Sequence, residues 1–187
     1  EPAIRDLSLT IPARSTVGFV GKTGSGKTTA VDILLGLLRP EEGSIWIDDV
    51  PLHQDNLRDW QDTVGYVPQH IYLADDTITN NIAFGVPEEQ IDKGAVEEAM
   101  KRAQIYDFVT EELSEGAQTI VGERGIKLSG GQKQRIGIAR ALYHAPSVLV
   151  FDEATSALDQ ATESRVMKAI RDLSGEHTII LIAHRLS

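Results

Sequence analysis

Eight residues near the start of the chain form a loop with the composition needed to hold phosphate. Residues 21–28 read Gly-Lys-Thr-Gly-Ser-Gly-Lys-Thr and match G-x-x-x-x-G-K-[ST] at every fixed position. Glycine lets the backbone curl so that successive N–H groups face one anion, and a helix beginning there adds its positive dipole end. Lys27 can then reach the β- and γ-phosphates of a nucleotide, and the Thr28 hydroxyl can ligate Mg²⁺.

A glycine-rich turn that fits this pattern by chance is the alternative. With ordinary glycine usage, a chance match anywhere in the chain has a probability below about one in a hundred. The pattern therefore predicts a nucleotide site. The residues predicted to bind the nucleotide are Gly21, Lys22, Thr23, Gly24, Ser25, Gly26, Lys27, Thr28 and Thr29.

Two carboxylates follow a short apolar run later in the chain. Residues 148–151 read Val-Leu-Val-Phe, and Asp152 and Glu153 come directly after them. In a parallel sheet, ligand chemistry lies at the carboxyl ends of the strands. Asp152 is then placed to hold Mg²⁺, and Glu153 to act as the general base for an attacking water, a role worth roughly 10²- to 10⁴-fold in rate. An acidic turn after a buried strand is common. The pair therefore indicates a catalytic site only in combination with the phosphate loop.

The elements that must position these residues alternate between short apolar runs and helical patterns. This order is typical of an α/β fold with a largely parallel sheet. Strands are expected at residues 4–11, 16–20, 44–47, 64–67, 147–151 and 178–182, and helices at 28–38, 95–103, 129–144 and 161–173. The first expected helix should stop at Arg39 because Pro40 disfavours helix in the residue before it.

The middle of the chain differs in character. Residues 75–118 are acidic, helical in pattern and free of β-rich runs. We expect them to form a helical subdomain inserted into an α/β core made of residues 1–74 and 119–187, with the helix 129–144 packed on it. Ser129 can cap that helix, because its side-chain oxygen can accept an N–H of the first turn.

The pentapeptide at the start of that helix distinguishes the chain from other phosphate-loop ATPases. Leu128, Ser129, Gly130, Gly131 and Gln132 match the signature motif of ABC proteins, and the chain resembles the nucleotide-binding domain of an ABC transporter. Ser129, the two glycines and the helix dipole could form a second phosphate site. A capped helix start with no further role is the structural alternative. The resemblance implies a phosphate-loop NTPase core with a mostly parallel sheet and an antiparallel β edge.

Other positions follow the family pattern in the same order along nearly the whole chain. The resemblance implies that Gln69 is the Q-loop glutamine, which touches Mg²⁺, and that His184 is the switch histidine, which contacts the γ-phosphate. The D-loop, at the dimer interface, is implied for Ser156, Ala157, Leu158 and Asp159. The implied catalytic residues are Lys27, Gln69, Glu153 and His184, and the implied Mg²⁺ ligands are Thr28, Gln69 and Asp152.

The resemblance also implies partners. Two nucleotide-binding domains would pair head to tail around two ATP molecules, and each would engage the transmembrane domain of the same transporter at the cytoplasmic face of a membrane. The chain would then be a fragment of a longer one. Residues 75–85 and 121–125 resemble the exporter type, and the first stretch is similar to flippases of lipid-linked oligosaccharides or polysaccharides.

Composition narrows the functional classes. A formal net charge of −10 over 187 residues argues against a protein that coats nucleic acid, because phosphate neutralisation needs clustered Lys and Arg. This disfavours a soluble ABC ATPase acting on chromosomes, DNA repair or the ribosome. A regulatory half that binds ATP without turnover is the other alternative, which intact Gln69, Glu153 and His184 disfavour. The absence of cysteine excludes disulfides and Cys-based metal sites.

Overall fold

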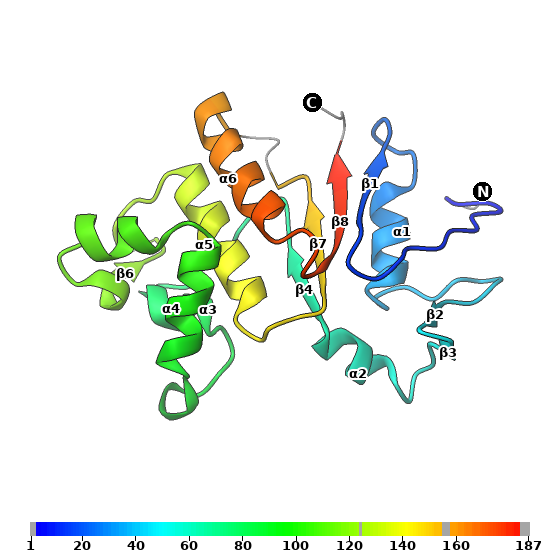
Figure 1. Ribbon diagram of the computed structural model, residues 1–187, viewed down its shortest axis with the longest axis horizontal. Helices are drawn as coiled ribbons and strands as arrows, with labels where there is room; N and C mark the ends of the chain where they lie inside the picture. Colours follow the sequence, from blue (N-terminus) through cyan, green and yellow to red (C-terminus); the bar gives the residue numbers. More distant parts are fainter. Residues whose placement is uncertain (1–2, 124, 155–157, 184–187) are drawn as a thin grey trace.

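A four-stranded parallel sheet forms the centre of the molecule. The computed structural model describes residues 3–123, 125–154 and 158–183. The strand order in the sheet is β1-β8-β7-β4, and all three neighbouring pairs are parallel (Figure 1). The carboxyl ends of the strands therefore meet at one edge. The strands are β1 (Thr16–Val20), β4 (Val64–Val67), β7 (Val148–Asp152) and β8 (Thr178–Ala183).

Helices cover both faces of this sheet. Because side chains alternate between the faces of a strand, Val150 and Ile180 face α1 (Lys27–Leu34) and pack with its Val31. Their neighbours Leu149, Phe151 and Ile179 belong to the larger core on the other face. That core is shared with α5 (Gly130–Leu142) and α6 (Gln160–Asp172). The sheet thus separates α1 from α5 and α6.

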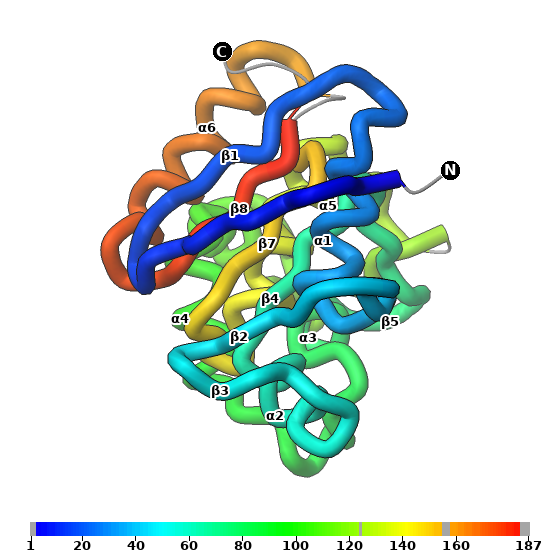
Figure 2. Tube along the Cα trace, turned by 90° about the vertical axis from the view of Figure 1, so that its right-hand side faces the viewer, coloured from blue at the N-terminus to red at the C-terminus, as the bar shows by residue number. Residues whose placement is uncertain are grey.

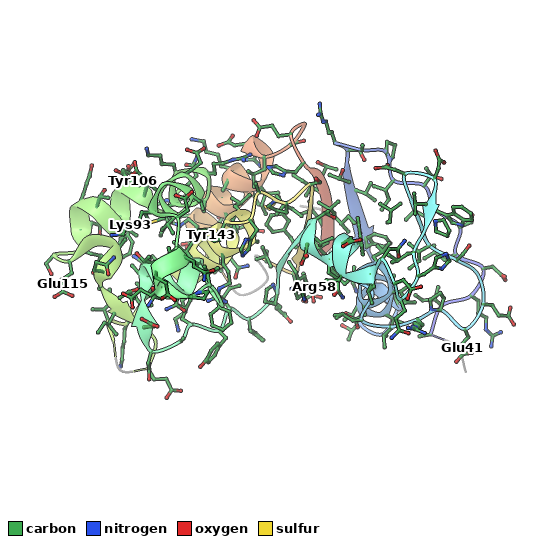
Figure 3. The ribbon with its side chains drawn as sticks, turned by 90° about the horizontal axis from the view of Figure 1, so that it is seen from below. Glu41, Arg58, Lys93, Tyr106, Glu115 and Tyr143 are labelled. Carbon is green, nitrogen blue, oxygen red and sulfur yellow. The ribbon has the colours of Figure 1, made fainter. Side chains whose placement is uncertain are left out.

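A helical region packs against α5 at one end of the molecule. It contains α3 (Ile78–Ile82) and α4 (Lys93–Arg102), both in contact with α5. The region also contains three short helices, η1 (Glu88–Gln90), η2 (Phe108–Glu112) and η3 (Gly116–Gln118). The two ends of its chain segment pair as the antiparallel strands β5 (Asp76–Thr77) and β6 (Ile120–Val121). Figure 3 shows Lys93, Tyr106 and Glu115 at this end and Arg58 and Glu41 toward the other.

A buried polar network ties the helical region to α5. Asn81 is fully buried, and its side-chain amide donates to the backbone oxygens of Ala74 (3.1 Å) and Thr77 (3.0 Å). The guanidinium of Arg140 donates to the backbone oxygen of Asn81 through Nε (2.7 Å) and lies 4.9 Å from the ring centre of Phe84. The helix that begins at the signature pentapeptide is therefore fixed to α3, and Asn81 joins α3 to the segment that precedes it.

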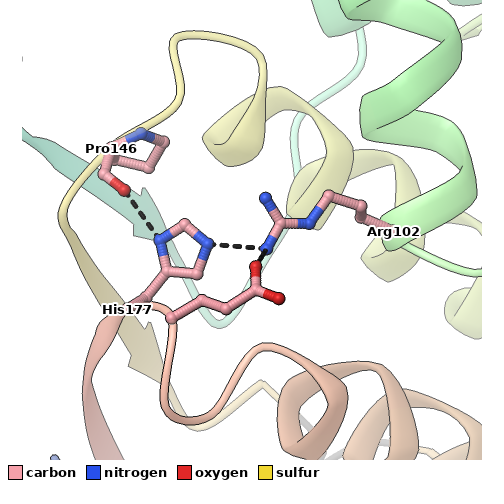
Figure 4. A network of polar contacts seen from close by, with 4 residues as sticks. Arg102, Pro146 and His177 are labelled. Atoms are coloured by element: carbon pink, nitrogen blue, oxygen red, sulfur yellow. Dashed lines mark hydrogen bonds and ion pairs between the residues drawn. The ribbon is translucent and has the colours of Figure 1, made fainter. Parts of the chain in front are cut away.

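A second network joins the end of α4 to the strands (Figure 4). The Nη2 of Arg102 lies 2.5 Å from Oε2 of Glu176 and 2.8 Å from Nε2 of His177. The Nδ1 of His177 lies 2.7 Å from the backbone oxygen of Pro146. Because a guanidinium can only donate, Nε2 of His177 accepts and Nδ1 carries the proton. These residues lie at the beginnings of β7 and β8, opposite the edge where the strands end.

Several predicted elements differ from the structure. Residues 4–11 form no strand, and Leu7 and Leu9 are 56 % and 51 % exposed. A strand needs a hydrogen-bonded neighbour, and this segment crosses the molecule apart from the antiparallel pair β2 (Trp46–Ile47) and β3 (Val50–Pro51), as Figure 2 shows. The strand predicted for residues 44–47 is reduced to β2.

The first helix is shorter than the predicted 28–38. It ends at Leu34, and α2 (Leu57–Asp62) follows later as a helix that the pattern did not predict. The reason for the early end is Gly36, whose φ of +69° is left-handed. The backbone N–H groups of Leu37 and Leu38 both donate to the backbone oxygen of Asp32, with N···O distances of 2.8 Å and 3.1 Å. A glycine-centred helix stop therefore precedes the proline that was expected to end the helix.

None of the helices in the described ranges has the length and apolarity needed to cross a bilayer.

Candidate functional site

The predicted phosphate loop connects the end of β1 to the start of α1. Gly24 and Gly26 adopt φ values of +79° and +85°, which L side chains rarely adopt. Gly26 is the N-cap of α1, and no side chain caps the helix there. The first-turn N–H groups of α1 therefore face the loop with the positive end of the helix dipole, an arrangement suited to an anion.

Lys27 lies deep in this loop. Its side chain is 9 % exposed, and Nζ donates to the backbone oxygens of Gly21 (2.7 Å) and Lys22 (3.1 Å). The loop backbone thus curls around the ammonium group. A phosphate entering the loop would meet a positive charge that is already in place.

The two acidic residues lie at the same edge of the sheet, at the end of β7. Asp152 is the last residue of the strand, and Glu153 follows with φ of +47°. The N–H of Glu153 donates to the backbone oxygen of Ile182 in β8 at 3.0 Å. This bond turns the chain at the point where the carboxylates are presented.

The end of β4 contacts both acids. The hydroxyl of Tyr66 donates to Oδ2 of Asp152 at 3.3 Å, and Nε2 of Gln69 donates to Oε2 of Glu153 at 2.9 Å. The predicted Gln69, Asp152 and Glu153 are thus brought together. Tyr66 was not predicted, and no signal in the sequence could have found it. Its contact depends on the register of β4 and β7, in which Tyr66 lies opposite Val150, two residues before Asp152.

The electrostatics of this edge reflect partial burial. Burial raises the pKa of Asp152, and the charge of Glu153 adds to the rise, whereas the hydrogen bond from Tyr66 and the charge of Lys27 lower it. Burial, followed by the charge of Asp152, raises the pKa of Tyr66 to about 12. The ammonium of Lys27 is thus close enough to Asp152 to affect its ionisation, as a shared phosphate and metal site requires.

The oxygen groups at this edge suit Mg²⁺. The predicted ligands are the hydroxyl of Thr28, the amide of Gln69 and the carboxylate of Asp152, all hard oxygen donors. No cluster of three or more His, Cys, Asp or Glu within the described ranges could hold a metal by itself. Mg²⁺ commonly uses one or two carboxylates and completes its shell with water and substrate phosphates, so a single aspartate fits it.

The signature pentapeptide forms a capped helix start. The N–H of Gln132 donates to Oγ of Ser129 at 3.2 Å, and the N–H of Ser129 donates to Oε1 of Gln132 at 2.7 Å. These reciprocal bonds form a capping box. Leu128 is buried, and a Cβ on Gly130 would lie 3.2 Å from the side chain of Leu158. The predicted cap is confirmed by this geometry.

Packing explains the second glycine of the pentapeptide. A Cβ on Gly131 would collide with the Cγ2 methyl of Thr162 in α6. Asp159 caps that helix, since its side chain accepts from the N–H of Thr162 at 3.0 Å. The pentapeptide therefore packs on the start of α6, across the sheet from the phosphate loop.

Of the remaining predicted residues, Ser156, Ala157 and His184 lie outside the described residues.

Comparisons with known proteins agree with these features. Residues 4–156 match the family model described as ABC transporter. The chain is 48 % identical over 181 residues to an ATP-dependent lipid A-core flippase of Francisella tularensis subsp. holarctica, covering 97 % of this chain and 29 % of that protein. It is 41 % identical over 186 residues to the flippase of the same description in Escherichia coli, covering 100 % of this chain and 32 % of the relative.

A solved structure shares the fold. It is described as a bacterial Atm1-family ABC exporter with ATP bound, and it superposes with a TM-score of 0.83 at 42 % identity. The match covers 96 % of this chain and 31 % of the exporter. The chain therefore spans about a third of the length of the relatives that it matches.

Proposed function

This chain belongs to the ABC transporter family as its ATP-hydrolysing domain, and we propose that it binds MgATP at the edge where β1, β4 and β7 end. The observation that carries the proposal is the convergence of Lys27, Gln69, Asp152 and Glu153 at that edge, around a loop with two left-handed glycines. Phosphate, metal and water can all be held there by groups of the right charge.

In the proposed reaction, the N–H groups of the loop and the ammonium of Lys27 bind the phosphates and orient the γ-phosphoryl group. The hydroxyl of Thr28, the amide oxygen of Gln69 and the carboxylate of Asp152 would hold Mg²⁺, which would neutralise negative charge on the phosphates. Glu153 accepts the proton of the attacking water, and the amide of Gln69 holds its carboxylate in place. Catalysis then rests on position and electrostatics.

A second copy of this domain would complete each site. Gly131 packs on Thr162 of α6, on the face of the sheet opposite α1, so the pentapeptide is not available to the nucleotide of its own chain. In a head-to-tail dimer Ser129 and Gly131 would face the γ-phosphate bound by the partner. We propose such a dimer, either of identical chains or of two halves of a transporter.

The membrane partner would meet the helical region. The two exporter-like stretches, 75–85 and 121–125, are joined by the β5–β6 pair, in which Asp76 lies opposite Val121. Phe84, in the first of these stretches, is 53 % exposed. We therefore propose that residues 75–118, with α5, form a helical subdomain that transmits the ATP cycle to a transmembrane domain at the cytoplasmic face of a membrane, with a lipid-linked saccharide as the class of cargo.

The test is the ATPase rate as a function of protein concentration, for the chain and for Glu153→Gln. A composite site predicts a rate per chain that rises with concentration and a variant that binds ATP without hydrolysing it. A rate that is independent of concentration would contradict the dimer. Equal rates for the chain and its variant would contradict the role of Glu153.

A further inference from the structure

We propose that Tyr66 is a positioning residue for Asp152, holding the carboxylate at the orientation in which it binds the metal. The inference rests on the proposed MgATP site and adds a residue to it. The starting observation is the hydrogen bond from the Tyr66 hydroxyl to Oδ2 of Asp152, 3.3 Å long, between neighbouring strands. Tyr66 is 38 % exposed, and its hydroxyl lies at the carboxylate that ends β7.

The strand register explains why a tyrosine can make this contact. Tyr66 lies opposite Val150 in the parallel pair of β4 and β7. Side chains two residues apart share a face, so Tyr66, Val150 and Asp152 all point to the side covered by α1. A phenol is long enough to extend past Val150 toward the carboxyl end of β7. A serine or threonine at the same position would be too short to reach the carboxylate.

The hydrogen bond constrains Asp152 and still leaves it able to bind a cation. A carboxylate has two oxygens with about four lone-pair positions, and the hydroxyl uses one of those on Oδ2. A phenol is protonated at neutral pH, so Tyr66 donates and adds no negative charge. The other lone-pair positions stay available to a cation, and the hydrogen bond to Oδ2 favours one orientation of the carboxylate.

Tyr66 and Gln69 therefore act as a pair. Tyr66 lies in β4 and Gln69 two residues after it, and each donates to one of the two acids at the end of β7, Tyr66 to Asp152 and Gln69 to Glu153. Residues that hold a metal ligand in this way typically change metal affinity by about 10- to 100-fold when they are replaced. The hydrogen bond here is long, so we expect a change near the lower end of that range.

The experiment compares Tyr66→Phe with the unmodified chain, since phenylalanine keeps the ring and removes only the hydroxyl. Binding of Mn²⁺ is followed by electron paramagnetic resonance in the presence of a non-hydrolysable ATP analogue. We expect Mn²⁺ to bind about tenfold more weakly in the variant. Binding of the analogue in EDTA should be unchanged, since the phosphate loop does not involve Tyr66. Tyr72→Phe is the matched control, because Tyr72 is 71 % exposed.

The outcomes separate the positioning role from the proposed function. Equal or tighter Mn²⁺ binding by Tyr66→Phe overturns the positioning role while leaving the MgATP site intact. An equal loss of analogue binding in EDTA and of Mn²⁺ binding would mean a general structural defect, and it overturns the role as well. Failure of the unmodified chain to bind Mn²⁺ with the analogue refutes the MgATP site itself, and the role of Tyr66 with it.

Discussion

The side-chain amide of Gln69 donates to Oε2 of Glu153 at 2.9 Å, joining the segment after β4 to the acid that follows β7. Glu153 is in turn held by its own N–H, which donates to Ile182 in β8. The proposed general base is therefore fixed by contacts from both neighbouring strands. Its orientation depends on residues that are distant in the sequence.

Replacing Gln69 by alanine should slow hydrolysis, because the carboxylate of Glu153 loses a donor. A hydrogen bond to a charged group contributes about 1.5–3 kcal/mol, so kcat should fall by about 10- to 100-fold. Steady-state ATPase assays on Gln69→Ala check this, with the exposed Gln90→Ala as the matched control. An unchanged kcat in Gln69→Ala would show that the amide does not orient the base.

Replacing Gly131 by alanine should destabilise the fold although alanine favours helices. The new Cβ would collide with the Cγ2 methyl of Thr162, and overpacking of this kind costs about 1–3 kcal/mol. Denaturant unfolding measures the loss. Thr162→Ser removes only the colliding methyl, so the double variant Gly131→Ala, Thr162→Ser should recover most of the stability. A double variant no more stable than Gly131→Ala would place the strain elsewhere.

The central strands could be predicted closely from the sequence. The strands predicted at 16–20 and 64–67 coincide with β1 and β4. The strand predicted at 147–151 is shifted by one residue from β7, and the one predicted at 178–182 ends one residue before β8 does. Buried parallel strands are continuous apolar runs bounded by polar residues, so they are visible without knowledge of their neighbours. The phosphate loop could also be recognised in the sequence, because its glycines, lysine and threonine lie at fixed spacings within eight consecutive residues.

Features that depend on a partner across space could not be predicted. Residues 4–11 alternate as a strand does, yet no strand pairs with them. The pair β5 and β6 has only two residues on each side, too few for a pattern. The contact of Tyr66 with Asp152 depends on the register of β4 and β7. The division into a core and a helical subdomain, and the roles of the individual site residues, stay predictions.

The pKa of Asp152 gives a prediction on stability. Burial raises this pKa above its value in the unfolded chain, so the folded state binds the proton more tightly. The cost of ionising Asp152 is therefore fully present above the folded pKa. This cost disappears as the pH falls from above the pKa of Asp152 in the folded state to below its pKa in the unfolded chain. Burial of Asp152 therefore lowers the stability of the folded state wherever its carboxylate is ionised.

Asp152→Asn should then be more stable than the unmodified chain at pH 7.5 in EDTA. Asparagine removes the charge and can still accept from Tyr66. The difference in melting temperature should shrink as the pH approaches 4, and Mn²⁺ binding should be lost at all pH values. Asp49→Asn, at an exposed turn, is the control. A variant that is less stable at pH 7.5 would mean that a cation pairs with Asp152 strongly enough to outweigh its burial.

Removing His177 should weaken the junction between the helical region and the sheet. His177 is buried, and its ring accepts from Arg102 and donates to the backbone oxygen of Pro146. His177→Ala removes the donor to the Pro146 oxygen and one of the two partners of Arg102, which keeps its contact with Glu176. A buried polar group without a partner costs about 1–3 kcal/mol. Denaturant unfolding should show a loss in this range, and His53→Ala, at an exposed position, should show none. Because Arg102 ends α4 and Pro146 precedes β7, hydrogen exchange should increase at both places in His177→Ala. Faster exchange around Pro146 alone would show that Arg102 is held by Glu176 without the histidine.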